Sequence, residues 1–342
     1  MTTAEVDETH PTNASGVTSS RLSSEFYFQC AVMLVGVVGT AGNGLVLYAL
    51  VVSKQHKKHV LIVNLNAMDL FSSLSVIVSY AMKIGSFHLT TAPAGNWLCM
   101  TQIIEGFIWL GTNGSAVNLA AISIDRYLRV VHRAWSAKTL RPWMTYAAAA
   151  VSWLIGIVYN MTIMLITLGI VDGLCHSYAT FNSDVGRIAA CVVYVLFFYV
   201  IMLVVFVLCY GRILVAVHRQ VDVMAAHSST AAGSTTAHTG SSKMKSDVIK
   251  TMILVCAFYA LTRLPTNVYM ILFAADPYRQ FLDGPYYASV FLAFLYTGAN
   301  PFIYAAKFEP VRKILRAMIP CKKSSATGNT TETNRRSAEE RL

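Results

Sequence analysis

Residues 191–210 read CVVYVLFFYVIMLVVFVLCY, a run of twenty residues without a single charge. A helix of about 20 apolar residues is long enough to cross the roughly 30 Å hydrocarbon layer of a bilayer. The chain contains seven such stretches, which we predict at 26–52, 60–82, 99–128, 143–170, 187–217, 246–274 and 285–305. Because backbone polar groups in lipid must be paired within the segment, we expect all seven to be helices.

The composition also indicates a membrane protein. The 342 residues are 55% hydrophobic and 13% charged, which is about half the charged share of an average soluble domain. A soluble protein this apolar would lack the polar surface needed to cover its core. The sequence therefore predicts an all-α seven-transmembrane helix bundle and argues against a soluble enzyme.

The distribution of basic residues predicts the orientation in the membrane. If the N-terminus is extracellular, 22 of the 27 Lys and Arg residues fall on the cytoplasmic side. The positive-inside rule then places the C-terminus in the cytoplasm. Topology and contact with acidic membrane lipid account for the net charge of +10, so no nucleic-acid partner is needed. Asn13 begins an Asn-Ala-Ser sequon and is a candidate glycosylation site on the outer side.

The chain divides into four predicted regions. An extracellular tail over 1–25 precedes the membrane domain over 26–305, which is followed by an amphipathic membrane-surface helix over 306–317 and a disordered cytoplasmic tail over 318–342. The segment 222–245 is rich in Ala, Ser, Thr, Gly and His, so we expect it to be mobile. The Ser and Thr residues of the C-terminal tail are either phosphorylation sites or simply keep the tail soluble.

Three polar features interrupt the apolar spans. Asp125-Arg126-Tyr127 ends the third span, where a charged pair can also be a simple membrane-boundary anchor. Asn300-Pro301-Phe302-Ile303-Tyr304 ends the seventh, and its proline removes a helical hydrogen bond, so we expect Asn300 to bond the backbone group left free. Asp69 lies within the second span, where a carboxylate is costly and indicates a function.

Taken in order, these features resemble the rhodopsin-like (class A) G-protein-coupled receptors over residues 26–316, without indicating a subfamily. The matching residues are Gly42-Asn43, Leu65 with Asp69, Asp125-Arg126-Tyr127, Trp153, Tyr210, Pro265 and Asn300-Pro301-Phe302-Ile303-Tyr304. The resemblance implies a receptor that binds an extracellular ligand in the outer bundle and activates a heterotrimeric G protein at its cytoplasmic face. It also implies that arrestin and receptor kinases act on the Ser/Thr-rich tail.

The resemblance assigns roles to residues at the cytoplasmic face. Arg126 would hold this face closed at rest and contact the G protein when active, and Asp125 would restrain Arg126. Tyr127 completes the motif. Tyr210 and Tyr304, the latter beside Pro301, would move inward on activation.

The resemblance also implies a central polar site and two covalent features. Asn43, Asp69, Ser115 and Asn300 would form the site that binds sodium in the family. Cys99 and Cys175 would form the outer disulfide, which the oxidising extracellular side permits. Cys321 follows the basic segment and is a candidate for palmitoylation.

Two positions depart from the family pattern. Arg263 stands two residues before Pro265, where the family has its switch Trp, and an Arg at this depth costs about 3 kcal/mol. It would replace sodium in part as the counter-ion of Asp69, or point outward and bind an anionic ligand. A third reading is an atypical receptor or scaffold whose switch is altered and which does not couple. Met202 stands where the fifth span usually has a proline, which predicts the loss of a local distortion.

A ligand pocket is predicted in the outer half of the bundle. Glu105, Trp109, Thr112 and Ser115 share one face of the third span. The upper part of that face would line the pocket with Tyr194, Asn267 and Tyr286, among others. These residues could equally serve only to pack helices.

Several ligand classes are disfavoured. Ile108 stands where aminergic receptors have an aspartate, and 285–305 contains no lysine to hold retinal. The nine histidines lie near or outside the span ends, which argues against an intramembrane metal site. The identity of the extracellular ligand is not readable from the sequence.

Overall fold

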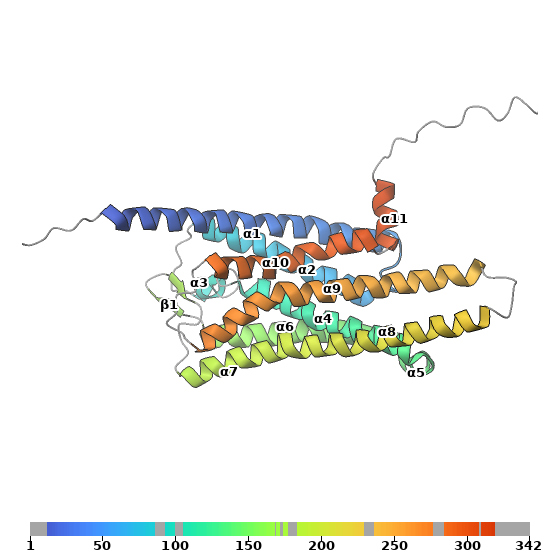
Figure 1. Cartoon of the computed structure of the whole chain (residues 1–342). Helices are drawn as coiled ribbons and strands as arrows, with labels where there is room; N and C mark the ends of the chain where they lie inside the picture. The colour runs from blue at the N-terminus through green and yellow to red at the C-terminus, as the bar shows by residue number, and fades with distance from the viewer. Residues whose placement is uncertain are drawn as a thin grey trace, which may run out of the picture.

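The structure is a computed structural model that describes residues 12–85, 93–99, 105–167, 169–171, 174–176, 183–228, 236–275, 284–307 and 309–318. Within these ranges, seven helical segments are long and apolar enough to cross a membrane, and they lie side by side in one bundle (Figure 1). The spanning helices are α1 (Thr12–Val52), α2 (Val60–Ile84), α4 (Gly106–Val131), α6 (Pro142–Thr167), α7 (Asp184–Val195) continued by η2 (Leu196–Val200) and α8 (Ile201–Ser228), α9 (Thr236–Ala275) and α10 (Gly284–Lys307). The predicted seven-helix bundle is confirmed.

Shorter elements lie at the two ends of the bundle. Helix α3 (Pro93–Leu98) and the antiparallel strands β1 (Gly169–Val171) and β2 (Leu174–His176) lie at the end where α4 begins, which we call the Glu105 end (Figure 1). Helices α5 (Arg133–Thr139) and α11 (Glu309–Met318) lie at the opposite end, which we call the Arg126 end. The hairpin was not predicted from the sequence.

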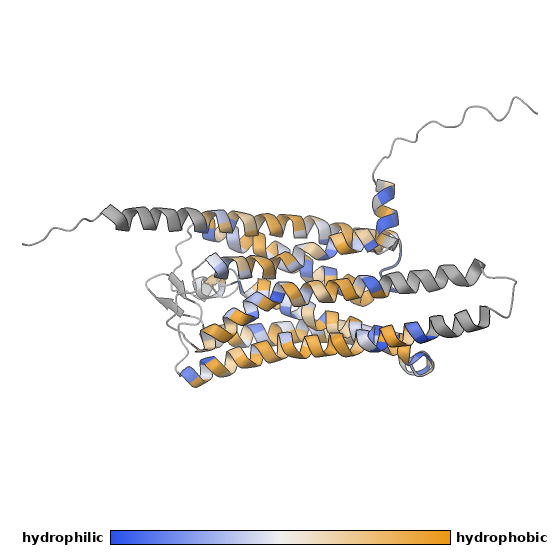
Figure 2. Ribbon diagram, in the orientation of Figure 1, coloured by the Kyte–Doolittle hydropathy of each residue, from blue (hydrophilic) through white to orange (hydrophobic). Residues whose placement is uncertain are grey.

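Hydrophobic residues predominate along the middle of the helices, and hydrophilic ones are more frequent toward the ends (Figure 2). Large apolar residues such as Val207 and Leu261 are about 70% exposed. Polar residues including Asn43, Asp69 and Asn300 are instead fully buried. This inversion of the soluble pattern is expected when lipid surrounds the bundle, since polar groups must then find partners inside it.

Several predicted boundaries shift. Helix α1 already begins at Thr12, within the segment assigned to an outer tail, and α4 begins at Gly106 rather than at 99. Helices α8 and α9 extend to Ser228 and from Thr236, into the segment expected to be mobile. A helix pairs its own backbone groups and can therefore form without burying a core.

The fifth span contains a distortion although it lacks a proline. Residues Leu196–Val200 form a π-helical turn that ends two residues before Met202, so the prediction that the missing proline removes the distortion is wrong. Two tyrosines connect this turn to α9: the Tyr199 hydroxyl donates to the Ala260 carbonyl at 3.0 Å, and the Tyr259 hydroxyl donates to the Phe198 carbonyl. A π-turn shifts backbone groups out of the regular helical hydrogen-bond pattern. Here the Tyr199 hydroxyl of the turn bonds to α9, and the Tyr259 hydroxyl of α9 bonds to the turn.

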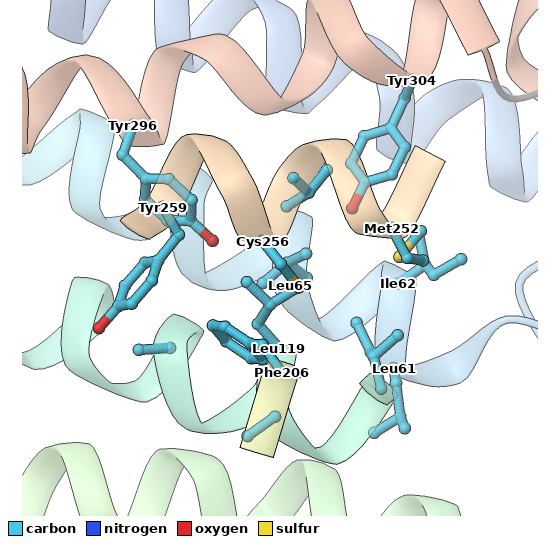
Figure 3. Close-up of a cluster of buried hydrophobic side chains, with 14 of the residues drawn as sticks. Leu61, Ile62, Leu65, Leu119, Phe206, Met252, Cys256, Tyr259, Tyr296 and Tyr304 are labelled. Atoms are coloured by element: carbon cyan, nitrogen blue, oxygen red, sulfur yellow. The ribbon is translucent and has the colours of Figure 1, made fainter. Parts of the chain in front are cut away.

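The half of the bundle toward the Arg126 end is filled by one apolar cluster. Tyr259, Tyr296, Met252 and Phe206 belong to it, and Figure 3 shows Tyr304 reaching from α10 into the same cluster. Helix α11 contributes buried Val311 and partly buried Ile314, which fix it against the bundle. The helices approach closely at glycines, and this matters most where Gly42 of α1 faces Pro301 of α10.

Candidate functional site

The polar centre of the bundle is built around Asp69, which is completely buried on α2. One carboxylate oxygen accepts a hydrogen bond from the Ser115 hydroxyl of α4 at 2.8 Å, and the other accepts one from the Asn300 amide of α10 at 2.6 Å. The structure therefore brings three of the four predicted residues of this site into direct contact. The side-chain oxygens of Asn300 and Asn43 are buried and make no hydrogen bond among the described residues.

The fourth predicted residue, Asn43, hydrogen-bonds to backbone carbonyls. Pro301 has no N–H, which leaves the carbonyl of Thr297, four residues earlier, without its helical donor. The Asn43 amide donates to this carbonyl at 2.9 Å and to Gly39 of its own helix at 2.9 Å. The expectation that Asn300 satisfies the backbone beside the proline is thus wrong, because Asn300 is committed to Asp69 and Asn43 lies closer to the break.

At the Arg126 end, Asp125 of the Asp125-Arg126-Tyr127 motif lies near two arginines, Arg126 and Arg129. Asp125 accepts two hydrogen bonds from Arg129, at 2.8 and 3.0 Å, whereas Arg126 is 4.0 Å away. The Nε of Arg126 is buried and has no hydrogen-bond partner in the described part of the chain. Tyr127 instead contacts His132, with 3.0 Å between its hydroxyl and Nε2.

A cavity of about 460 Å³ opens beside Arg126. Its charged lining is mostly basic and includes Lys57, Lys58, Arg126 and Arg129 against Asp125. Burial, followed by the positive charges of Arg126 and Lys58, lowers the pKa of His59 to about 4. The imidazole is therefore neutral at physiological pH, and the cavity presents an electropositive surface.

The two other tyrosines expected at this end are both buried. The Tyr210 hydroxyl accepts a hydrogen bond from Ser123 at 3.3 Å, one turn of α4 before Arg126. Tyr304 is fully buried in the apolar cluster with Met252 and Ile62 (Figure 3). Tyr210 thus contacts α4 near the Asp125-Arg126-Tyr127 motif, and Tyr304 lies in the apolar cluster of the same half of the bundle.

The family model described as the 7 transmembrane receptor (rhodopsin family) matches residues 42–304. The chain belongs to this family. It is a receptor rather than an enzyme, and a multi-pass protein of the plasma membrane.

Curated relatives of the receptor are distant but span most of its length. The allatostatin-A receptor of Bombyx mori is 23% identical over 84% of this chain and 78% of the relative. The galanin receptor 2b of Danio rerio is 25% identical over 84% of this chain and 73% of the relative. The somatostatin receptor type 5 of Bos taurus is 26% identical over 86% of this chain and 77% of the relative.

At the Glu105 end of the receptor, the predicted pocket residue Glu105 is already engaged. It accepts a hydrogen bond from the Tyr80 hydroxyl at 2.8 Å and pairs with Lys83 at 2.5 Å. Its backbone is left-handed, with φ of 66°, at the residue that precedes α4. Glu105 therefore connects α2 to the start of α4.

Below Glu105, Trp109 contacts two residues of other helices. Its ring lies 5.6 Å from that of Phe294 on α10, and the guanidinium carbon of Arg263 on α9 lies 5.4 Å from the Trp109 ring centre. Arg263 is 3% exposed, one turn before Asn267 and two residues before Pro265. No ion pair joins Arg263 to Asp69, although both residues are described.

The remaining pocket candidates differ in whether their polar groups already make hydrogen bonds within the bundle. Thr112 donates to the Ile108 carbonyl of its own helix at 2.9 Å, and Asn267 donates to the Arg263 carbonyl at 2.7 Å. Tyr194 stacks in an aromatic cluster with Phe198. Tyr286 lies 5.8 Å from Tyr269, ring to ring. Apart from Thr112, whose hydroxyl is used within α4, these residues remain candidates for ligand contact.

The covalent features are described only in part. Cys99 is disulfide-bonded, whereas Cys30, Cys191, Cys209 and Cys256 are free thiols. Cys175 lies in β2 opposite Ile170, and its pairing with Cys99 stays a prediction. Cys321 and the side chain of Asn13 lie outside the described residues.

Sequence reasoning missed the partners that hold the predicted residues. Lys83 and Tyr80 were not associated with Glu105, nor Arg129 with Asp125. Spacing could have found the second pair, since Asp125 and Arg129 are four residues apart on one helix. Lys83 and Glu105 are 22 positions apart, one on α2 and the other directly before α4. No local sequence pattern signals such a contact.

Proposed function

We propose that the receptor binds an extracellular peptide at its Glu105 end and activates a heterotrimeric G protein at its Arg126 end. The observation that carries the coupling proposal is the basic cavity beside Arg126, whose Nε is buried and makes no hydrogen bond among the described residues. Such a face is suited to receive the carbonyls or carboxylates of a protein partner. The relatives are receptors named for allatostatin-A, galanin and somatostatin, which supports a peptide ligand.

The two ends are connected by α4. Seventeen residues separate Trp109 from Arg126, which is about 25 Å of helix. Asp69 contacts this helix midway, at Ser115, and also contacts α10 through Asn300. A ligand that favours one packing of these helices at the Glu105 end would shift the population of conformations at the Arg126 end.

We further propose that the polar centre holds a sodium ion. The Asp69 carboxylate and Ser115 hydroxyl offer oxygen ligands, and the unpartnered side-chain oxygen of Asn300 adds a third. A bound cation would supply the positive charge that a buried carboxylate requires. Arg263 makes no ion pair with Asp69 in the described conformation, which supports a separate cation at this place.

At the cytoplasmic side, we propose that the Ser/Thr-rich tail over 318–342 recruits receptor kinases and arrestin. Basic residues near the inner membrane surface would contact acidic lipid. An extracellular N-terminus and a cytoplasmic C-terminus complete the proposal and follow from the basic residues gathered at the loops of the Arg126 end and in the tail.

The coupling proposal is tested by measuring G-protein activation in cells, with and without a panel that includes allatostatin-A, galanin and somatostatin peptides. We expect wild-type signal above mock-transfected cells and its loss in Arg126→Ala at matched surface expression. Lys138→Ala, which removes a basic residue of the same end, serves as the matched control and should retain signalling. Signal that persists unchanged in Arg126→Ala, or a well-expressed wild type silent in every G-protein assay, would favour the non-coupling receptor with an altered switch at Arg263.

A further inference from the structure

Arg263 is a buried cation whose hydrogen-bonding capacity is unused within the described part of the receptor. Its side chain is 3% exposed, yet Nε, Nη1 and Nη2 all lack a hydrogen-bond partner. The guanidinium carbon Cζ lies over the Trp109 ring, 5.4 Å from the ring centre. A cation at membrane depth is costly unless it meets an anion or water, so the arrangement is suited to an anionic group.

The two carboxylates nearest in the bundle are already occupied. Glu105 is paired with Lys83 and accepts a hydrogen bond from Tyr80. Asp69 accepts hydrogen bonds on both of its oxygens, from Ser115 and Asn300. Neither makes an ion pair with Arg263, so no acidic side chain of the described residues is in direct contact with its charge.

The height of the guanidinium along the bundle separates it from the polar centre. It stacks on Trp109, whereas Asp69 bonds Ser115, six residues further along α4 and about 9 Å lower. Helical side chains also tilt toward the N-terminus of their helix, which moves the Trp109 ring further toward the Glu105 end. Arg263 therefore lies on the side of the bundle where we propose that the ligand binds.

The chemistry of the group selects the kind of anion. A guanidinium presents its N–H groups in a planar fork that matches the two oxygens of a carboxylate. The contact with Trp109 uses none of the N–H groups, since Nε, Nη1 and Nη2 make no hydrogen bond among the described residues. Trp109 also contacts the Phe294 ring, 5.6 Å away, so the surroundings favour a carboxylate carried on an apolar or aromatic body.

We propose that Arg263 binds a carboxylate of the receptor's ligand, with Trp109 fixing the orientation of the guanidinium. This inference rests on the proposed function, in that it requires an extracellular ligand at the Glu105 end. A peptide offers this group as its free C-terminus or as an Asp or Glu side chain. The residue that replaces the family's switch Trp thereby becomes the contact that selects for a negatively charged ligand.

The test measures the thermal unfolding midpoint of the purified full-length receptor in detergent, with phenylacetate as the probe and its neutral isostere phenylacetamide for comparison. Both are added at millimolar concentration in sodium HEPES buffer, with sodium chloride in a separate arm. A ligand that binds the folded state raises the midpoint. We expect a rise of about 2–4 °C with phenylacetate, and no rise with phenylacetamide.

Variants assign the effect to the guanidinium. Arg263→Gln should abolish the response to phenylacetate, and Arg263→Lys should weaken it because an ammonium lacks the fork. Lys83→Gln, which removes a partly exposed cation of this end, should keep the response. An equal response in Arg263→Gln, no response in the wild type, or a response to chloride alone would each overturn the proposal.

A second measurement separates the proposal from pairing with Asp69. Removing an unpaired buried charge stabilises a fold, whereas removing one partner of a buried ion pair destabilises it. We therefore expect Arg263→Gln and Arg263→Trp to have higher unfolding midpoints than the wild type without any probe. Lower midpoints that are restored by adding Asp69→Asn would show that Arg263 is the counter-ion of Asp69, and the proposal would be wrong.

The binding readout involves no G protein, so the two proposals fail separately. Phenylacetate binding that depends on Arg263, combined with signalling insensitive to Arg126→Ala, would retain the carboxylate site and reject coupling. Coupling that depends on Arg126 without any response to phenylacetate would do the reverse.

Discussion

At the scale of single residues, the position of Asp125 between two arginines has a consequence for basal activity. Arg129 holds the carboxylate with two hydrogen bonds, while Arg126 stays 4.0 Å away. Removing Arg129 should leave Asp125 free to restrain Arg126. An ion pair this exposed contributes up to about 1 kcal/mol, so we expect Arg129→Ala to lower basal G-protein signalling by up to about fivefold.

The measurement is ligand-independent G-protein activation at matched surface expression. Arg133→Ala removes a neighbouring exposed arginine and should leave basal signalling unchanged. Equal or higher basal signalling in Arg129→Ala would show that Asp125 does not turn to Arg126 when it is released.

His59 gives the folded receptor a dependence on pH. Burial and the charges of Arg126 and Lys58 lower its pKa to about 4, against an ordinary value of 6.5. The unfolded chain therefore binds more protons than the folded one between these values, and stability falls as pH falls from about 6.5 toward 4. We expect His59→Gln to lose less thermal stability than the wild type between pH 7.5 and 4.5.

The control for this experiment is His218→Gln, which removes an exposed histidine and should follow the wild-type profile. Identical profiles for wild type and His59→Gln would contradict a neutral, buried imidazole at position 59.

Residue types in the polar centre could be predicted from the sequence, but not every contact. Asp69, Ser115 and Asn300 are brought together as the resemblance implied. Asn43 was placed in the same cluster, yet it bonds the backbone beside Pro301. Whether the amide of Asn43 or of Asn300 reaches the Thr297 carbonyl depends on the exact position of α1 against α10. A sequence motif does not contain that information.

At the scale of helices, the contact between α1 and α10 depends on the absence of a side chain at Gly42. A Cβ there would lie 2.8 Å from Cβ of Pro301 and 2.9 Å from its Cγ. The helices would have to separate, which also weakens the hydrogen bond from Asn43 to Thr297. We expect Gly42→Ala to lower the free energy of unfolding by about 1–3 kcal/mol.

Gly44→Ala is the matched control, since a Cβ at Gly44 meets nothing within 4 Å. Because Ala favours a helix over Gly, this variant should be neutral or more stable by up to about 1 kcal/mol. Thermal unfolding and surface expression measure both variants, and equal stability of the two would refute a tight contact at Gly42.

The π-helical turn in the fifth span offers a second test at this scale. The Tyr259 hydroxyl donates to the Phe198 carbonyl in this turn. We expect Tyr259→Phe to destabilise the receptor by about 1 kcal/mol. Tyr194→Phe, whose hydroxyl makes no hydrogen bond to a described residue, is the control and should leave the unfolding midpoint unchanged.

The seven helices were predictable because hydropathy alone identifies membrane spans. Their ends and irregularities were not. Helix α4 begins after a left-handed Glu105, and the fifth span is distorted at Leu196–Val200 without any proline. Both features depend on contacts with another helix, from Lys83 in the first case and Tyr259 in the second, which the local sequence does not encode.

At the scale of the whole molecule, the asymmetry of charge leads to a test of topology. Because 22 of the 27 basic residues lie on one side of the predicted topology, the N-terminus should be extracellular. An epitope tag at the N-terminus should therefore stain intact cells, and one at the C-terminus should stain only permeabilised cells. Staining of the C-terminal tag on intact cells would contradict this orientation.

Glycosylation tests the same topology by an independent route. Sequons begin at Asn13, Asn113, Asn160 and Asn329. Asn113 and Asn160 are buried between α4 and α6, where the Asn113 amide donates to the Asn160 side chain at 3.2 Å, so neither is accessible to a glycan. Asn329 lies in the predicted cytoplasmic tail. We expect Asn13→Gln to lower the apparent mass of the receptor from cells to that of the glycosidase-treated protein, and Asn329→Gln to leave it unchanged. A mass change in Asn329→Gln alone would place the C-terminus outside, and with it the basic Arg126 end, which would remove the physical basis for coupling to a cytoplasmic G protein.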